Sequence, residues 1–269
     1  MSTSTSTSNM SLDVSQTPPI PFSRLVSVEL RKMVDTRAGR WLLISIAGLT
    51  ALVLTIQLIV LLTQDQEATF GSFGAGANIP MVILLPVLGV MSVTGEWTQR
   101  TAMVTFALVP SRGRVIAAKY VSALAIAVVA VVVAYVLMAV ANLVYGGASS
   151  FPLVWDSSAF GVFLTFLLYV IGMTTGFAFG AALLNTAVAI VVYFVYNFVL
   201  PGLMELGAYY LDWFKSIRDW IDFNAAQTPL QGGTSVTGTE WAHLLVSGLI
   251  WVGIPLAIGL RRMLRAEVK

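Results

Sequence analysis

One stretch of the sequence, GEWTQRTAMVTFALVPSRGR (residues 95–114), gathers the side chains most able to do chemistry. It holds a carboxylate, three arginines and several hydroxyls between two long apolar runs. A catalytic site needs a base, a nucleophile and an orienting group, and this trio is not present. Glu96 and Arg100 stand four residues apart with the carboxylate first, the order that favours a helical ion pair of roughly 0.2–0.5 kcal/mol. We therefore predict a helical segment over Glu96–Val109 that another protein holds, and no catalytic loop.

Metal, thiol and nucleotide chemistry have no support in the sequence. It has no cysteine and a single histidine, His243, whereas metal and haem sites use several ligands close together. No G-x-x-x-x-G-K-[ST] phosphate loop occurs, and GSFGAG at residues 71–76 lacks the lysine and the strand-to-helix setting. We expect GSFGAG to form a short loop between spans, and we predict no cofactor in this chain.

Polar residues inside the apolar runs are the remaining candidates for function. Tyr193, Tyr196 and Asn197 share one helical face just before Pro201. Such residues either line a translocation route or bond neighbouring helices, and both readings stay open. No acidic or basic residue lies near the middle of a run, which argues against a proton- or sodium-coupled carrier. The candidate pathway residues are Gln57, Asn142, Tyr193, Tyr196 and Asn197.

The composition is that of a multi-pass membrane protein. Of the 269 residues 57% are apolar and only 10% charged, and the mean hydropathy is +0.85, far from the range of soluble domains. A helix needs roughly 20 apolar residues to cross about 30 Å of hydrocarbon. The sequence predicts an all-α fold, with a disordered Ser/Thr-rich tail over residues 1–20 and a transmembrane domain over residues 21–269. The predicted spans are Trp41–Thr63, Ile79–Gly95, Ile116–Val144, Ala159–Leu184, Thr186–Met204 and Trp241–Leu260.

The distribution of lysine and arginine predicts the orientation of these spans. All basic residues except Lys215 and Arg218 lie before span one, between spans two and three or in the first turn of span three, or after span six. Basic residues beside short loops are retained in the cytoplasm, so both termini are expected there. The basic residues are then explained by topology, and no nucleic-acid partner is needed.

Two amphipathic segments are predicted to lie in the membrane interfaces. Pro21–Met33 has a helical apolar pattern with Arg24, Glu29, Arg31 and Lys32 opposite, and we expect it on the cytoplasmic side. Between spans five and six, Leu206, Tyr210, Trp213, Ile217 and Trp220 predict an aromatic-rich helix on the outer side. Residues Gln227–Gly238 are expected to form a loop into span six.

Span four carries a stripe of glycines at every fourth residue, Gly172, Gly176 and Gly180. Such a stripe lets another helix approach closely. Packing within the chain is the default interpretation, and a seam between two copies is the alternative.

These residues resemble a known family, the permease subunits of type-2 ATP-binding-cassette (ABC) exporters, particularly the small six-span bacterial ones. GEWTQRTAMVTFALVPSRGRVIAAKY is similar to their segment after the second span, and VELRKMVDTRAGRWLL to their approach to span one. FNAAQTPLQGG resembles their outer loop before span six, and LRRMLRAEVK their basic tail. The turn at Asn185 and Thr186 departs from the pattern because it lacks the basic residue that many relatives carry.

The resemblance implies a half-transporter in the bacterial inner or plasma membrane. Two permease chains, identical or paralogous, would each grip a separate ATPase through the segment Glu96–Val109, and ATP and Mg²⁺ would bind that partner. Glu96, Arg100, Thr101 and Arg112 would transmit force. The alternatives are a membrane-embedded lipid-modifying enzyme, for which no acid–base or metal cluster is found, and a non-transporting membrane anchor of a cytoplasmic complex.

Overall fold

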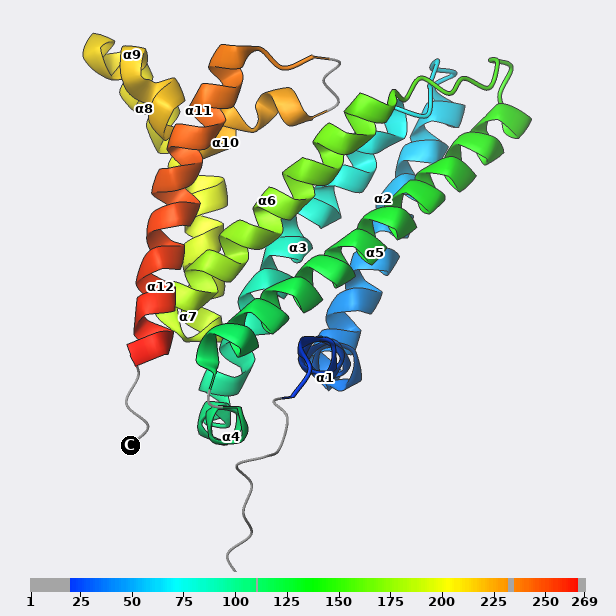
Figure 1. The fold of residues 1–269 in the computed structure, drawn as a ribbon. Coiled ribbons are helices and arrows are strands. Elements are labelled where there is room, and N and C mark those ends of the chain that lie inside the picture. Colours follow the sequence, from blue (N-terminus) through cyan, green and yellow to red (C-terminus); the bar gives the residue numbers. More distant parts are fainter. Residues whose placement is uncertain (1–19, 110, 232–234, 266–269) are drawn as a thin grey trace, which may run out of the picture.

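The computed structural model describes residues 20–109, 111–231 and 235–265, and all regular structure in these ranges is helical (Figure 1). The predicted disordered tail, apart from Ile20, falls outside the described residues. The elements are α1 (Phe22–Asp35), α2 (Arg37–Thr63), α3 (Ser72–Thr98), α4 (Ala102–Leu108), α5 (Arg112–Ala148), α6 (Ala159–Leu183), α7 (Thr186–Phe194), η1 (Val195–Val199), α8 (Leu200–Tyr210), α9 (Asp212–Ile221), α10 (Phe223–Ala226), η2 (Thr228–Leu230), α11 (Gly238–Gly248), η3 (Leu249–Gly253) and α12 (Ile254–Arg265).

Six stretches in the described part of the chain are long and apolar enough to cross a membrane. They are α2, α3, α5, α6, the continuous run α7–η1–α8, and the run α11–η3–α12. The all-α fold with six spans is therefore confirmed. In the last two runs a π-helical turn, η1 or η3, joins two α-helical parts.

The centre of the bundle is the contact between α3 and α6. A side chain at Gly176 would place its first carbon 2.0 Å from the carbonyl oxygen of Pro86, and one at Gly89 would lie 2.2 Å from the carbonyl oxygen of Met173. The two backbones therefore touch, which only glycine permits on both sides. The glycine stripe of span four thus serves packing inside the chain, as the default interpretation predicted.

Pro86 lies inside α3 and removes one backbone hydrogen bond from that helix. The carbonyl left without its donor is that of Val82, four residues earlier. The hydroxyl of Tyr193, on α7, donates to this carbonyl at 3.0 Å. Pro86 is tolerated because a neighbouring span supplies the missing donor, as membrane helices require.

The tight turn between α6 and α7 follows from two residues. Leu184 ends α6 in the left-handed conformation, with φ of 53°. The side chain of Asn185 then caps α7 by accepting from the backbone N–H of Val188 at 3.1 Å. The turn therefore needs no loop residues beyond this pair.

The start of α3 differs from the sequence prediction. GSFGAG does not form a loop, because α3 begins at Ser72, seven residues before the predicted Ile79. The carboxylate of Asp156, from the connection before α6, accepts hydrogen bonds from the Gly71 N–H and the Thr69 hydroxyl, each at 2.7 Å. A carboxylate is favourable at a helix N-terminus, so this contact fixes the early start.

The outer amphipathic segment also differs, because the helix predicted through Leu206 and Trp220 is broken. Leu211 is extended, with φ of −127° and ψ of 102°, so Leu206 and Tyr210 belong to α8 and Trp213 begins the face of α9. The predicted loop Gln227–Gly238 begins with a helical turn, η2, in which Leu230 is buried.

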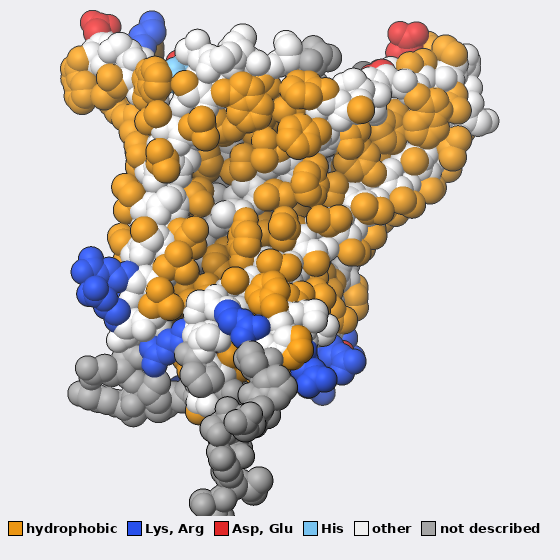
Figure 2. Space-filling model, in the orientation of Figure 1, with side chains coloured by type: hydrophobic (Ala, Val, Ile, Leu, Met, Phe, Trp, Pro, Cys, Tyr) orange, Lys and Arg blue, Asp and Glu red, His pale blue; other side chains and the backbone are white. Residues whose placement is uncertain are grey.

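Two helices, α1 and α4, lie across the ends of the spans and appear end-on in Figure 1. They mark the same end of the bundle as the last turn of α12. Lysine and arginine side chains gather at this end in Figure 2, below sides covered by apolar side chains. We refer to it as the basic end.

We predict that Gly176→Ala lowers the thermal unfolding midpoint of the chain in detergent. The added carbon meets the α3 backbone, and overpacking of a tight contact costs roughly 1–3 kcal/mol. Gly147→Ala is the matched control, because a carbon added at this exposed glycine of α5 meets nothing within 4 Å. Equal midpoints for the two variants would contradict the backbone contact.

Candidate functional site

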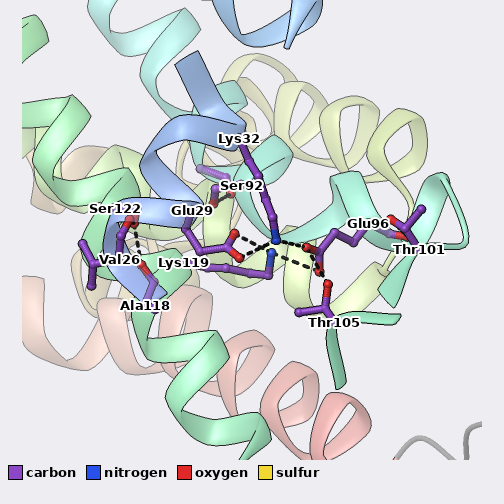
Figure 3. Close-up of polar contacts among 11 residues, drawn as sticks. Val26, Glu29, Lys32, Ser92, Glu96, Thr101, Thr105, Ala118, Lys119 and Ser122 are labelled. Atoms are coloured by element: carbon purple, nitrogen blue, oxygen red, sulfur yellow. Dashed lines mark hydrogen bonds and ion pairs between the residues drawn. The ribbon is translucent and has the colours of Figure 1, made fainter. Parts of the chain in front are cut away.

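Four charged side chains form a closed ring at the basic end (Figure 3). The Lys32 ammonium lies 2.7 Å from Oε1 of Glu29 and 2.6 Å from Oε1 of Glu96. The Lys119 ammonium lies 2.8 Å from Oε2 of Glu29 and 3.1 Å from Oε2 of Glu96. Each carboxylate oxygen thus meets one ammonium, and the ring has no net charge.

The ring joins three elements that are distant in sequence. Glu29 and Lys32 come from α1, Glu96 from the last turn of α3, and Lys119 from the second turn of α5. The side chain of Lys119 is 6% exposed, and those of Glu29 and Glu96 are 8% and 13% exposed. Charges this deeply buried are stable only when paired, so α1 must lie where the ring can close.

Lys32 is the most accessible member, with 40% of its side chain exposed. Partial burial favours the neutral amine, but hydrogen bonds and attraction from Glu29 and Glu96 outweigh it, so the pKa of Lys32 is raised. Lys32 therefore stays charged at neutral pH.

Further contacts tie α1 and α4 to the ring. The hydroxyl of Ser122 on α5 donates to the Val26 carbonyl of α1 at 3.0 Å. The hydroxyl of Thr105 on α4 donates to Oε1 of Glu96 at 3.1 Å. One hydrogen bond thus connects α4 to a carboxylate of the ring.

The predicted helix over Glu96–Val109 is not continuous. Glu96 belongs to α3, which ends at Thr98, and α4 covers only Ala102–Leu108. Arg100 lies between them in the left-handed conformation, with φ of 58°. The predicted Glu96–Arg100 helical pair is wrong, because the chain leaves the helix at Arg100 and Glu96 turns inward to two lysines.

The four predicted coupling residues therefore fall in different places. Glu96 is in the ring, whereas Arg100 and Thr101 are exposed in the turn between α3 and α4. Arg112, the first residue of α5, lies over the Phe106 ring of α4 at 5.1 Å from its centroid. Its guanidinium also donates to the carbonyls of Met263 and Leu264 at 3.3 and 3.2 Å. Arg112 thus connects α4, α5 and the end of α12.

The five predicted pathway residues are not all brought together, because Gln57 and Asn142 lie apart from the other three. Gln57 donates to the Ser72 carbonyl at 2.8 Å and Asn142 to the Val154 carbonyl at 3.2 Å, so both hold the ends of spans opposite the basic end. Tyr193 supplies the donor that Pro86 removes. Gln57 and Tyr193 thus bond neighbouring helices, the second of the two open interpretations, and Asn142 bonds the connection between α5 and α6.

Tyr196 and Asn197 have a different setting. With Tyr193 they line a cavity of about 60 Å³ between α3, α6 and η1. The Tyr196 ring meets Trp251 of η3 with 5.0 Å between centroids, and its buried hydroxyl has no hydrogen-bond partner in the described structure. The two π-helical turns thus face one another beside this cavity.

Sequence reasoning missed three members of the ring, namely Glu29, Lys32 and Lys119. Glu29 was placed on the polar face of the first amphipathic helix, but it is buried against α5. The position of Glu29 in the sequence indicates its burial. It lies four residues after Leu25 and four before Met33, on the apolar face of the helix. A carboxylate on an apolar face indicates a buried partner.

The six apolar spans define a multi-pass membrane protein without a metal-binding cluster in the part of the chain that is described. A family model for an ABC-2 family transporter protein matches residues 42–268, most of the chain. The protein therefore belongs to this family, the membrane components of ABC transporters, which have no nucleotide-binding domain of their own. A comparison with curated proteins found no significant match.

We predict that Lys119→Met destabilises the chain by about 3–5 kcal/mol, because it leaves two buried carboxylates with one ammonium. The double variant Glu96→Gln/Lys119→Met keeps a neutral Glu29–Lys32 pair and should lose less than the two single variants summed. Equilibrium unfolding in mixed micelles measures each free energy.

The matched control for this double-mutant cycle is Lys215→Met, which removes an exposed ammonium from α9 at the other end of the bundle. Its unfolding free energy should change by no more than about 0.5 kcal/mol. Additive losses in the Glu96 and Lys119 cycle would show that the ring is not an energetic unit.

Proposed function

We propose that the chain is the permease subunit of an ATP-driven exporter, moved by a separate ABC ATPase that binds α4. The observation that carries this proposal is the link from α4 through Thr105 and Glu96 to the buried charge ring. ATP and Mg²⁺ bind the partner, and this chain converts the partner's movement into a rearrangement of its spans.

The accessible surface around α4 supports docking at this place. Arg100, Thr101 and Ala107 are exposed, while Ala102 and Phe106 are buried against the bundle. A partner can therefore hold α4 from outside without displacing its packing. Arg112 transmits the same movement toward α5 and α12, and Glu96 transmits it toward α1.

In this proposal the basic end faces the cytoplasm, where the ATPase is found. The described basic residues gather there, apart from Lys215 and Arg218 on α9. Retention of basic flanks in the cytoplasm gives this orientation for a chain in the bacterial inner membrane.

The proposed orientation predicts an accessibility pattern, and the absence of cysteine allows single-cysteine variants to be used directly. A membrane-impermeant maleimide should label Ser157→Cys in intact cells and Gln99→Cys only after permeabilisation. Both positions are exposed, at opposite ends of the bundle. Labelling of Gln99→Cys in intact cells would show that the basic end faces the outside. It would also contradict the docking of a cytoplasmic ATPase on α4.

Two permease copies, identical or paralogous, form the transporter in this proposal. Large apolar side chains are exposed along α2, α5 and α7, including Ile56, Val129 and Val191, and these faces meet lipid or the second copy. Tyr193, Tyr196 and Asn197 are the candidate pathway residues that line a cavity, and cargo contact is assigned to Tyr196 and Asn197 ahead of Gln57 and Asn142.

Docking on α4 is tested by capturing the ATPase encoded beside this chain with the tagged, detergent-extracted permease. Ala107→Arg adds bulk and charge to the exposed face of α4 and should reduce capture by about tenfold, or about 1.4 kcal/mol. Ala159→Arg places the same change at an exposed helix end on the opposite side of the bundle and should leave capture unchanged. If the unaltered chain captures no ATPase, the proposal is wrong.

Force transmission is tested in the same assembled complex with Thr105→Val, a change of similar shape that removes the hydrogen bond to Glu96. Capture should persist while substrate-stimulated ATP hydrolysis falls by about fivefold or more. Thr55→Val, on the exposed side of α2, is the control. Unchanged stimulation in Thr105→Val would exclude the charge ring from the coupling path.

A further inference from the structure

A cavity of about 610 Å³ opens at the basic end between α1, α2, α3, α4 and α5. Its volume is within the range of roughly 300–1,000 Å³ that is typical of small-molecule sites. The exposed residues Thr98, at the end of α3, and Gln99 and Thr101, in the α3–α4 turn, belong to its lining, so the cavity can be reached from outside.

The cavity has an apolar wall and a charged end. The wall is aliphatic and comes from three spans, with side chains Leu42, Leu43, Leu88, Met91 and Ile126. The charged end is the ring itself, because all four of its members line the cavity. Contact between this aliphatic wall and water is unfavourable, whereas an alkyl chain in the cavity would bury the aliphatic surface favourably.

The ring determines which head group fits. All four carboxylate oxygens already face an ammonium, so the ring offers little to a cation (Figure 3). An ammonium carries three N–H donors. Lys32 directs two of them to Glu29 and Glu96 and is 40% exposed, which leaves a donor for an acceptor in the cavity.

The mouth of the cavity adds positive charge. Ala38 and Gly39, in the first turn of α2, line the cavity, and they are flanked by the exposed residues Arg37 and Arg40. Asp35 is also exposed in the α1–α2 connection. These three side chains, two cations and one carboxylate, have a net positive charge. This charge attracts an anion to the mouth of the cavity.

We propose that this cavity binds an anionic amphiphile, with its alkyl chain along the apolar wall and its phosphate or carboxylate head at Lys32. The site lies at the basic end, where α3 ends and α2 and α5 begin. The occupant would be wedged between α1 and α4 beside the charge ring. This inference does not depend on the proposed ATPase coupling, because binding needs only the folded permease.

The test uses the full chain in nanodiscs with three photoreactive probes that carry a diazirine in the same acyl chain. They are phosphatidylglycerol, phosphatidylcholine and the free fatty acid. We expect labelling of α2 and α3 peptides that line the cavity, at least fivefold stronger with the anionic probes than with phosphatidylcholine. Stronger labelling by the fatty acid or by phosphatidylglycerol identifies the source of the anionic head, and both outcomes support the proposal.

Variants that fill the cavity distinguish it from general lipid contact. Gly95 lines the cavity, and a carbon added there meets nothing within 4 Å, so Gly95→Leu should occupy the space and reduce labelling at least fivefold. Met91→Trp fills the same space from another turn of α3 and should give the same loss. Gly48→Leu is the matched control on the exposed side of α2, where labelling should persist.

The head-group contact is tested with Lys32→Gln, which should abolish the preference for the anionic probes. Arg31→Gln, the exposed neighbour on α1, should keep that preference. Labelling that survives both filling variants, or that is equal for phosphatidylcholine and the anionic probes in the unaltered chain, would overturn the proposal.

Discussion

The structure depends on how a ring of four charges, of which only Lys32 is substantially exposed, is held at the end of an apolar bundle. An isolated ammonium or carboxylate has a large desolvation penalty, so each member of the ring requires its partners in place. Glu29 and Glu96 each bridge the same two lysines, which makes the ring neutral and closed. The position of α1 is therefore fixed by charge pairing as much as by its apolar face. A shift of α1 would separate its Glu29–Lys32 pair from the Glu96–Lys119 pair of α3 and α5, and each charge would lose one of its two partners.

The contact between α3 and α6 differs from the charge ring, because it is made by backbone atoms and not by charged side chains. There the backbones touch through Gly89 and Gly176, and no side chain can adjust to a change in spacing. The bundle thus combines a centre that resists sliding with a peripheral ring held by polar contacts. Hydrogen bonds and ion pairs can exchange partners over small movements, whereas touching backbones cannot. A push on α4 would therefore change the ring before it changes the centre.

Much of the fold could be predicted from the sequence because hydropathy and basic flanks are strong signals in membrane proteins. The six spans follow from the apolar runs, and the glycine stripe of span four indicated the close contact with α3. The family model, which matches residues 42–268, confirms the family that the resemblance in residues 95–120 indicated. The α3 boundary was missed because Asp156, more than eighty residues away in sequence, holds Gly71.

The candidate site was harder to predict, since its members come from three separate elements. Local spacing favoured a pair between Glu96 and Arg100. In the structure the chain turns away at the left-handed Arg100, and Glu96 pairs with Lys32 and Lys119. Tyr193 was assigned a possible pathway role because polar residues in spans are rare. Its contact with the Val82 carbonyl depends on Pro86 in another span, and no local pattern reveals such a relation. Glu29 is the exception, because its helical position alone was informative.

The π-helical turns η1 and η3 have a consequence for how these two spans are compared with related sequences. A π-turn holds one residue more than the α-turn it replaces, which rotates the following segment by about 100° around the helix axis. A helical wheel drawn through all of Thr186–Tyr210 therefore assigns the wrong face to every residue after η1. An alignment of this chain with a relative whose span is uninterrupted needs a one-residue gap at Val195–Val199, and another at Leu249–Gly253, before equivalent faces coincide.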